Sequence, residues 1–286
     1  MSSRRQWLQP LCSCPHNPAV SSTAWQHRLE RAETLTRLYP FASEILSFYS
    51  RVTQFQESLF QRLEQAVASS MQPSDRDLSS PSELPVLIPS FPAFLSLAAT
   101  HAPGRLAGNA RAMLDQGASA WSQLLNHSWL SSDASPTQPA DFLARIFLQP
   151  YAELLRFRAA MNWQGYTHSL CPFCHRKPGI AVLRQQGDGA RRSLMCSFCL
   201  AEWDFRRIVC PACGEEDNRK LPVYTADQFK YIRVECCDSC RTYLKAINLT
   251  RNGLAEPIVD ELACVPLDLW ARERGYAKLE LNLLGM

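Results

Sequence analysis

Four cysteine pairs with the same internal spacing are the residues of this sequence best suited to chemistry. Each pair reads Cys-x-x-Cys, and the pairs are Cys171/Cys174, Cys196/Cys199, Cys210/Cys213 and Cys237/Cys240. A Cys-x-x-Cys turn can direct both of its sulfurs at one metal ion, and two such turns complete a tetrahedron with metal–sulfur distances of about 2.3 Å. The spacing therefore predicts two four-cysteine metal sites.

The order of the pairs indicates which of them share an ion. The first and third pairs contain a proline after the first cysteine, whereas the second and fourth lack it and are followed by an aromatic residue, Trp203 or Tyr243. Two tandem copies of one ribbon would leave this alternation. The predicted ligands are Cys171, Cys174, Cys196 and Cys199 for site 1 and Cys210, Cys213, Cys237 and Cys240 for site 2. A cross-braced arrangement, which joins the first pair with the third, is the alternative.

The predicted sites have consequences for function. Four protein ligands leave no open coordination position, so such a site suits structure or electron transfer better than hydrolysis. The sequence also lacks a glycine-rich phosphate loop, a G-x-S-x-G elbow and an H-E-x-x-H helix. We therefore expect no catalytic residues, and we expect that the protein is not an enzyme.

The remaining cysteines fit a site less well. Cys236 adjoins a predicted ligand and could compete with it, and Cys264 lies in an apolar run typical of a small core residue. Cys12 and Cys14, together with His16, could form half of a third site, but no second half follows, so a free tail is the favoured interpretation.

Composition indicates the compartment and the partners. The N-terminus has no apolar segment typical of a signal peptide, and no apolar run reaches the ~18 residues that span a bilayer. We expect a cytoplasmic protein with no membrane insertion, whose thiols are reduced and free to bind metal.

Eight thiolates and two divalent ions would lower the formal charge from +3 to about −1. The basic pairs Arg191-Arg192 and Arg206-Arg207 are therefore interpreted as solvated surface rather than as phosphate contacts, and no nucleic-acid partner is expected.

The elements that position the cysteines follow from the hydrophobic pattern. Residues 1–22 lack periodicity and are predicted to be a mobile tail. Apolar residues then recur every three or four positions, which predicts a helical domain at 23–165. A first rubredoxin-like metal domain is predicted at 166–208 and a second at 209–255. A helical tail is expected at 256–286, with Gly275 at a helix C-cap.

Within these domains the pattern predicts individual elements. Helical spacing covers 41–68, about 93–101 and 105–130, and the proline-rich stretch at 69–92 predicts an extended connection of polyproline type. Residues 141–162 are expected to form two helices split at Pro150, because proline removes a helical hydrogen bond. Hairpins are predicted at 179–195 and 221–234.

The cysteine-rich half resembles a known family. The segments are CPFCHRKPG, LMCSFCLAEWDFRRIVCPACGE, VECCDSCRTYLKAINL and DELACVPLDLWARERGYAKLELNLLG, and together they resemble the bacterial formate dehydrogenase accessory protein FdhE. The match covers about 170–286 and is loose over the helical half. Its most specific marks are Glu202-Trp203 after the second pair and Thr242 to Lys245 after the fourth. Cys236 departs from the pattern, where a small residue that is not a ligand is expected.

The resemblance implies a role and a cofactor. It implies a cytoplasmic assembly factor, or chaperone, that binds the catalytic subunit of respiratory formate dehydrogenase and is needed for its maturation. It also implies rubredoxin-like sites associated with iron, and zinc is the alternative metal. The fold class predicted is therefore α+β multidomain, with a mostly helical N-terminal domain followed by two tandem rubredoxin-like metal domains.

Two other functions stay open on the sequence. One is a rubredoxin-like electron carrier or redox sensor, because iron in a tetrathiolate site changes its charge by one unit. The other is a nucleic-acid-binding zinc ribbon, which would need a concentrated basic surface. The sequence leaves the oligomeric state, the metal and the client-binding surface undecided.

Overall fold

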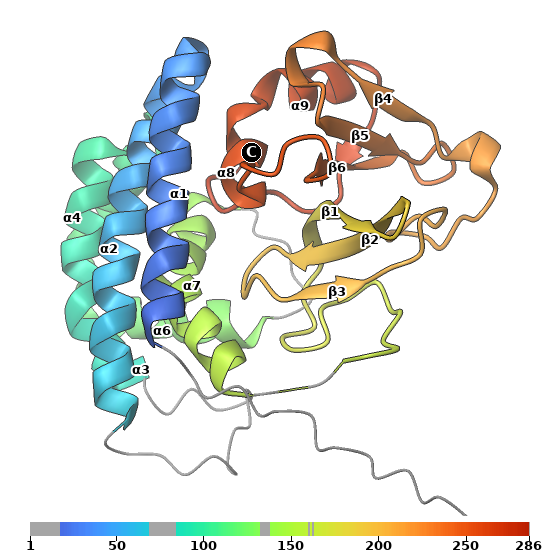
Figure 1. Cartoon of the computed structure of the whole chain (residues 1–286). Helices are drawn as coiled ribbons and strands as arrows, with labels where there is room; N and C mark the ends of the chain where they lie inside the picture. Colours follow the sequence, from blue (N-terminus) through green and yellow to red (C-terminus); the bar gives the residue numbers. More distant parts are fainter. Residues whose placement is uncertain (1–17, 69–83, 132–137, 160, 162, 286) are drawn as a thin grey trace, which may run out of the picture.

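The computed structural model describes residues 18–68, 84–131, 138–159, 161 and 163–285. A helical N-terminal part and a C-terminal part built on a sheet lie side by side (Figure 1). Within the described residues no strand precedes Pro178, and both four-cysteine clusters follow the helical part, from Cys171 onward. The predicted α+β class, with helices first and cysteine clusters second, is confirmed.

The helical part is organised around one central helix. Its helices are α1 Pro18–Leu38, α2 Ser43–Ala68, α3 Leu84–Leu87, α4 Phe91–His101, α5 Gly104–Leu114, α6 Gly117–Leu130 and α7 Pro139–Arg158. Helix α7 is buried from Phe142 to Leu155 because α2, α4, α5 and α6 all pack against it. No helix in the described ranges combines the length and the apolarity that a membrane span requires.

The prediction that Pro150 splits 141–162 into two helices is wrong. Pro150 lies inside the continuous helix α7. A proline in this position leaves the carbonyl of the residue four positions earlier, Ile146, without its helical N–H donor. The side chain of Gln56, on α2, replaces that donor: its Nε2 donates to the Ile146 oxygen at 2.6 Å. A contact with a residue distant in the sequence thus supplies the hydrogen bond that proline removes from the helix.

Two other helical predictions need correction. The expected polyproline connection is helical over its described part, 84–92, because Leu87 and Phe91 are fully buried there and each proline occupies a first helical turn, where no N–H is needed. The helical spacing of 105–130 is interrupted at Gly117, whose φ of +80° ends α5 and allows α6 to begin. Residues 69–83 lie outside the described ranges, as do residues 1–17 of the predicted tail; the rest of that tail begins α1.

The C-terminal part is built on one sheet. In the described residues its seven strands are β1 Pro178–Gln186, β2 Gly189–Cys196, β3 Glu202–Asp204, β4 Val223–Thr225, β5 Ile232–Cys236, β6 Thr242–Asn248 and β7 Ala277–Lys278. Their order is β3-β2-β1-β6-β5-β4, and β7 also pairs with β6. The antiparallel pairs β1–β2 and β4–β5 confirm the two predicted hairpins.

A parallel pairing joins the two hairpins. Strand β1 pairs with β6 at Ala181↔Ala246, Val182↔Ile247 and Leu183↔Asn248. Strand β6 is buried at six of its seven positions, as befits a central strand covered on both faces. The two ribbons expected as tandem domains therefore share one sheet, while the exact domain boundaries stay a prediction.

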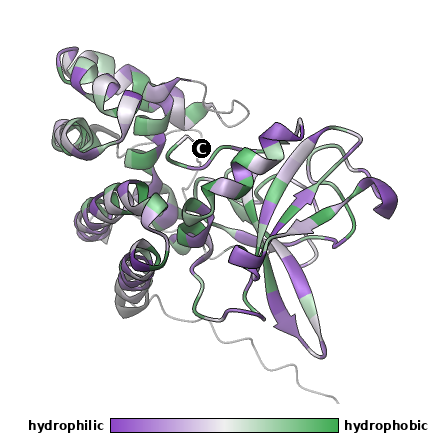
Figure 2. Cartoon of the chain, turned by 90° about the horizontal axis from the view of Figure 1, so that it is seen from above, coloured by the Kyte–Doolittle hydropathy of each residue, from purple (hydrophilic) through white to green (hydrophobic). Residues whose placement is uncertain are grey.

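The C-terminal tail, predicted to be helical at 256–286, is helical up to Glu273 and then continues as the strand β7 and irregular chain. It contains α8 Pro257–Ala263 and α9 Val265–Glu273, and Gly275, with a φ of +75°, follows α9 at the expected C-cap. The end of the chain then runs between the helical part and the sheet, where Gly285 lies against the ring of Phe142 (Figures 1 and 2). The last residues therefore take part in the contact between the two halves.

Buried ion pairs connect the two halves. Arg31 on α1 binds Asp260 on α8 with both ends of its guanidinium, at 2.8 and 2.5 Å. Arg145 on α7 binds Glu280, near the C-terminus, at 2.7 Å. Because a buried charge without a partner costs several kcal/mol, these pairs hold the helical layer against the C-terminal segment in one register.

A third buried cluster lies inside the C-terminal part. Lys245 on β6 is fully buried and contacts Asp268 at 2.6 Å and Glu261 at 2.9 Å. Lys278 on β7 contacts the same two carboxylates. Burial alone would lower the pKa of Lys245, but the surrounding anionic groups raise that pKa well above its ordinary value. Lys245 is therefore charged, and it fastens α8 and α9 to the central strand.

Candidate metal centres

All four Cys-x-x-Cys turns have the same backbone geometry. In each, the N–H of the first cysteine donates to the carbonyl five residues later, at 2.8–2.9 Å. The residue directly after each pair has a left-handed φ between +56° and +78°, and these residues are His175, Leu200, Gly214 and Arg241. A positive φ is costly for a residue with a side chain, so the repetition in four turns marks a shape that the surrounding structure enforces.

His175 illustrates what that repetition means. It follows Cys174 directly in the sequence. The structure places it, exposed, at the left-handed position of the first turn, where glycine stands in the third. Its place is therefore explained by the turn.

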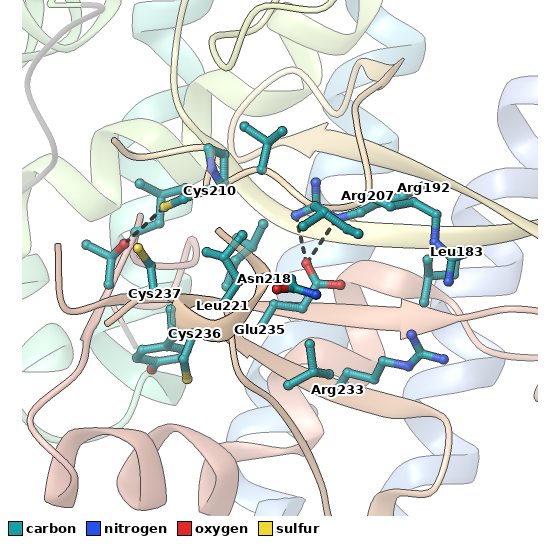
Figure 3. A pocket seen from close by; sticks show the side chains of 18 residues that line it. Leu183, Arg192, Arg207, Cys210, Asn218, Leu221, Arg233, Glu235, Cys236 and Cys237 are labelled. Atoms are coloured by element: carbon teal, nitrogen blue, oxygen red, sulfur yellow. Dashed lines mark hydrogen bonds and ion pairs between the residues drawn. The ribbon is translucent and has the colours of Figure 1, made fainter. Parts of the chain in front are cut away.

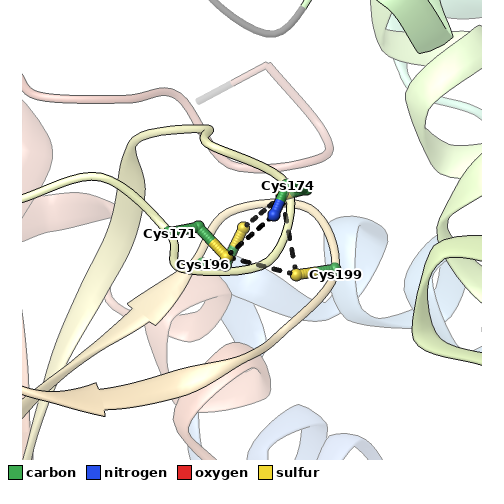
Figure 4. Close-up of side chains that lie close together, drawn as sticks. All are labelled: Cys171, Cys174, Cys196 and Cys199. Carbon is green, nitrogen blue, oxygen red and sulfur yellow. Dashed lines mark hydrogen bonds between the residues drawn. The ribbon is translucent and has the colours of Figure 1, made fainter. Parts of the chain in front are cut away.

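The four sulfurs of the first set converge (Figure 4). The Sγ atoms of Cys171, Cys174, Cys196 and Cys199 all lie within 4.8 Å of one another. Cys174 is 3.4 Å from Cys196 and 3.6 Å from Cys199, and Cys171 is 3.5 Å from Cys199. A tetrahedron with metal–sulfur bonds of about 2.3 Å has sulfurs about 3.8 Å apart, so the set matches such a site to within a few tenths of an ångström.

The sulfurs of the second set converge in the same way. The Sγ atoms of Cys210, Cys213, Cys237 and Cys240 lie within 4.8 Å of one another. Cys210 is 3.7 Å from Cys240, and Cys213 is 3.7 Å from Cys237. The structure thus groups the pairs in sequence order, first with second and third with fourth, and not as a cross-brace.

Backbone N–H groups point at the sulfurs. The N–H of Phe173 donates to Cys171 Sγ, that of Phe198 to Cys196 Sγ and that of Ala212 to Cys210 Sγ, each at 3.4 Å. Such bonds favour the thiolate over the thiol, because they stabilise negative charge on sulfur. Hydrogen bonds to cluster sulfurs are also among the factors that tune the potential of an iron–sulfur site.

The surroundings shift the pKa values of three cysteines of site 1 in opposite directions. Burial alone would raise the pKa of Cys196, but hydrogen bonds from the other three cysteines and from Phe198 hold it well below its ordinary value. Hydrogen bonds with Cys171 and Cys196 raise the pKa of Cys174 well above its ordinary value. Burial, together with hydrogen bonds to the other three cysteines, raises the pKa of Cys199 in the same way. One thiolate is therefore stabilised by neighbouring thiols, and a metal ion would displace their protons.

Site 1 is buried against the helical part. Arg156 on α7 donates from Nε to the carbonyl of Cys199 at 2.9 Å. Arg176, which follows the first turn, donates to the carbonyl of Ser128 at the end of α6 at 2.5 Å and stacks on the ring of Phe198 at 4.4 Å. Four thiolates carry more negative charge than one divalent ion neutralises. The two arginines lie beside these thiolates and offset the excess negative charge.

Site 2 is more open. Cys213 is exposed and Cys240 is half-buried, whereas Cys171 and Cys199 of site 1 are fully buried. The hydroxyl of Thr242 lies 3.0 Å from Cys240 Sγ. Burial alone would raise the pKa of Cys240, yet hydrogen bonds from Thr242 and the neighbouring thiols lower it to about 7. The two sites therefore share a geometry but differ in their access to solvent.

The other cysteines lie apart from both sets. Cys236 is buried on the far side of β5 in a hydrophobic cluster with Tyr243 and Cys264, and neither thiol belongs to a four-sulfur set. Cys264 contacts the carbonyl of Glu261. Cys12 and Cys14 lie outside the described residues. The roles of the two arginines beside site 1 were missed from the sequence. Arg156 belongs to the separate helix α7, and the carbonyl that Arg176 contacts lies more than forty positions away along the chain.

Two family models match the cysteine-rich half. The central domain of FdhE matches residues 170–207, and the C-terminal domain of FdhE matches residues 208–284. The first matched segment contains the four cysteines of site 1, and the second contains those of site 2 together with α8, α9 and β7. The boundary between the two models therefore falls between the two candidate sites.

Curated relatives match about half of the chain. A protein named FdhE homolog from Aquifex aeolicus is 34% identical over 146 residues, which cover 50% of this chain and 51% of the relative. The FdhE homolog of Haemophilus influenzae strain PittEE is 33% identical over 141 residues, or 49% of this chain and 45% of the relative. The chain spans about half the length of the curated relatives it matches.

A solved structure extends the likeness to the whole fold. The crystal structure of the FdhE protein from Pseudomonas aeruginosa matches with a TM-score of 0.66 and covers 91% of this chain and 95% of that chain. The sequence identity is 21%, so this likeness concerns the fold alone. It includes the helical half, over which the sequence resemblance is loose.

Proposed function

Because residues 170–284 match the central and C-terminal domain models of FdhE, we propose that the chain is a member of the FdhE family and an accessory factor for the maturation of a respiratory formate dehydrogenase. In this proposal it binds the catalytic subunit of that enzyme in the cytoplasm while the subunit's cofactors are completed. The observation that carries the proposal is the extent of the match, which includes both four-cysteine sets and the C-terminal segment that fastens them to the helices.

The role proposed is assembly rather than catalysis. Four sulfurs in each set satisfy a tetrahedral ion and leave no position for substrate or water. Each set also joins two separate turns of the chain, so a bound metal would stabilise its ribbon directly. Two rigid ribbons on a helical body provide a surface for a protein client.

We propose that both sites bind metal through the eight cysteines, with iron favoured and zinc as the alternative. Tetrathiolate sites accept either ion, and zinc ranks above ferrous iron in affinity. Protein purified anaerobically at native levels should therefore show sulfur-to-iron charge-transfer absorption and two equivalents of metal. Stoichiometric zinc without iron in that preparation would exclude the iron assignment.

An electron carrier or redox sensor is the second candidate. It is favoured by the N–H bonds to Cys171, Cys196 and Cys210 and by the exposure of Cys213 at site 2. A redox titration of the anaerobic protein separates the candidates, because a reversible one-electron change supports the carrier and a silent site supports a structural role.

The nucleic-acid alternative receives little support. Of the two basic pairs at 191–192 and 206–207, three arginines are bound to carboxylates: Arg191 to Asp204, Arg192 to Glu235 and Arg206 to Glu216. A phosphate-binding surface needs several free cations in a row. The ribbons therefore lack the concentrated charge that this function requires.

A deletion strain tests the assembly proposal. The strain should make the formate dehydrogenase polypeptide at normal levels, as seen by immunoblot, yet oxidise little formate. Wild-type protein and the variant Cys264→Ser, which alters a buried thiol outside both sets, should restore activity, whereas Cys171→Ser should not. Normal formate oxidation in the deletion strain would exclude the proposal.

A further inference from the structure

A cavity of about 350 Å³ lies beside site 2, where the two ribbons meet. Its lining comes from β1 and β2 of the first ribbon, from the connection at 207–211, and from β5 and β6 of the second. Figure 3 shows that the cavity has two different ends, with Cys210 and Cys237 at one and Arg192, Arg207 and Arg233 at the other. Its volume lies within the range of ligand-binding cavities.

The register of β5 explains why charged groups face this cavity. Along β5, Ile232, Val234 and Cys236 are buried among the residues that pack under α9. Arg233 and Glu235 alternate with them and therefore point to the opposite face, where both line the cavity. The alternation thus places two charged residues of β5 at the cavity.

The three arginines differ in whether a carboxylate balances their charge. Arg192 donates from Nε and Nη2 to one oxygen of Glu235 at 2.9 and 2.7 Å and from Nη1 to the carbonyl of Arg206, so its charge is balanced. Arg207 and Arg233 form no ion pair within the part of the chain that the structure describes. The arginine end of the cavity therefore keeps two uncompensated positive charges, and a guanidinium is well shaped to bind a carboxylate.

The walls and the rim of the cavity are apolar. Leu221 and Leu244 form part of the wall, and at the rim Ile208 and Val223 are 55% and 53% exposed. Val223 belongs to β4, the edge strand of the sheet, whose outer side no strand of the described residues covers. Exposed aliphatic side chains next to unpaired cations match a ligand that combines apolar and acidic groups, and inorganic phosphate does not have that combination.

We propose that this cavity binds an extended peptide segment of a partner protein, with an acidic side chain at Arg207 and Arg233 and apolar side chains against Ile208 and Val223. This proposal rests on the proposed function in one respect, which is that the partner is a protein. A nucleic-acid strand is disfavoured, because two free cations in an apolar cavity do not form the track that a phosphate backbone follows.

Fluorescence polarisation with the full-length, metal-loaded protein tests the proposal. The probe is a short labelled peptide of alternating Leu and Glu, compared with its counterpart that has Gln in place of Glu and with a labelled single-stranded oligonucleotide. We expect the acidic peptide to bind more tightly than the Gln peptide, and added salt to reduce that difference. Replacement of one arginine, in Arg207→Gln or Arg233→Gln, should weaken the acidic peptide about tenfold, because a hydrogen bond to a charged group is lost.

The matched control is Arg272→Gln, which removes the same charge from the exposed face of α9, away from the cavity. It should bind the acidic peptide as the wild type does, and circular dichroism of all variants checks that they fold. Equal affinity for the acidic and Gln peptides, no binding by the wild type, or wild-type affinity in both arginine variants would overturn the proposal. So would variants that lose only oligonucleotide binding. None of these results affects the proposed function, which the deletion strain tests separately.

Discussion

Replacement of Gln56 by leucine tests how α7 tolerates a proline in its middle. Leucine is close to glutamine in size but cannot donate a hydrogen bond. In the wild type the substitution leaves the carbonyl of Ile146 without the bond that Gln56 supplies at 2.6 Å, and no backbone N–H can replace it, because residue 150 is proline. The second contact of Gln56, to Gln149 Oε1 at 3.1 Å, is lost as well.

The magnitude follows from burial. Gln56 and Gln149 are each 2% exposed, and Ile146 is fully buried, so water cannot solvate the freed carbonyl. A buried acceptor left unsatisfied costs about 1–3 kcal/mol, and we expect Gln56→Leu to lower the free energy of unfolding by about 2 kcal/mol. In the Pro150→Ala background, the N–H of residue 150 can donate to the same carbonyl. In that background, Gln56→Leu should lower the free energy of unfolding by about 1 kcal/mol less than it does in the wild type.

Urea unfolding followed by far-UV circular dichroism measures this difference, because helices dominate that signal. The four proteins of the cycle are compared at equal metal content, and Gln54→Leu, at an exposed position of the same helix, serves as the control with little expected effect. If Gln56→Leu costs the same with proline or alanine at position 150, the side chain does not replace the missing backbone donor and the explanation of the intact helix is refuted.

Three further predictions concern the metal sites and the buried charges. Replacing Cys171 and Cys174 by serine should halve the metal content and leave site 2 filled, as metal analysis would show; loss from both sites would contradict the sequential grouping. Site 2 should release its metal to a chelator faster than site 1, because Cys213 is exposed, and equal release rates in a colorimetric chelator assay would refute this. Lys245→Met should lower the free energy of unfolding by about 3 kcal/mol, since it leaves carboxylates buried with one cation fewer; an unchanged urea midpoint would argue against it.

The sequence predicts those features that depend on local spacing. The Cys-x-x-Cys pairs, the hairpin around Gly187 and the C-cap at Gly275 each follow from residues that are close together in the chain. Each of these features is carried by residues within a short stretch of the chain, so the local pattern is sufficient to predict it. The alternation of the two kinds of cysteine pair likewise suggested the sequential grouping that the structure has.

Features that depend on distant residues escaped prediction. Helix α7 continues through Pro150 because Gln56 lies against it, and nothing near Pro150 in the sequence reports that contact. The pairing of β1 with β6 joins residues more than sixty positions apart, and its parallel direction is not encoded in either strand alone. The charge of Arg233 could be recognised as unbalanced only once the structure showed that Glu235 binds Arg192.

The buried ion pairs have a consequence for the synthesis of the chain. Arg31, Arg145 and Lys245 are all translated before their carboxylate partners, which belong to the segment from Asp260 to Glu280. Until that segment leaves the ribosome, the three cations cannot be buried without a large penalty, although helices and ribbons made earlier can already form. The halves should therefore dock only after the segment from Asp260 to Glu280 has been made. A chain that lacks this segment would stay open and accessible to proteases, so the segment acts as a checkpoint between synthesis and any meeting with a partner.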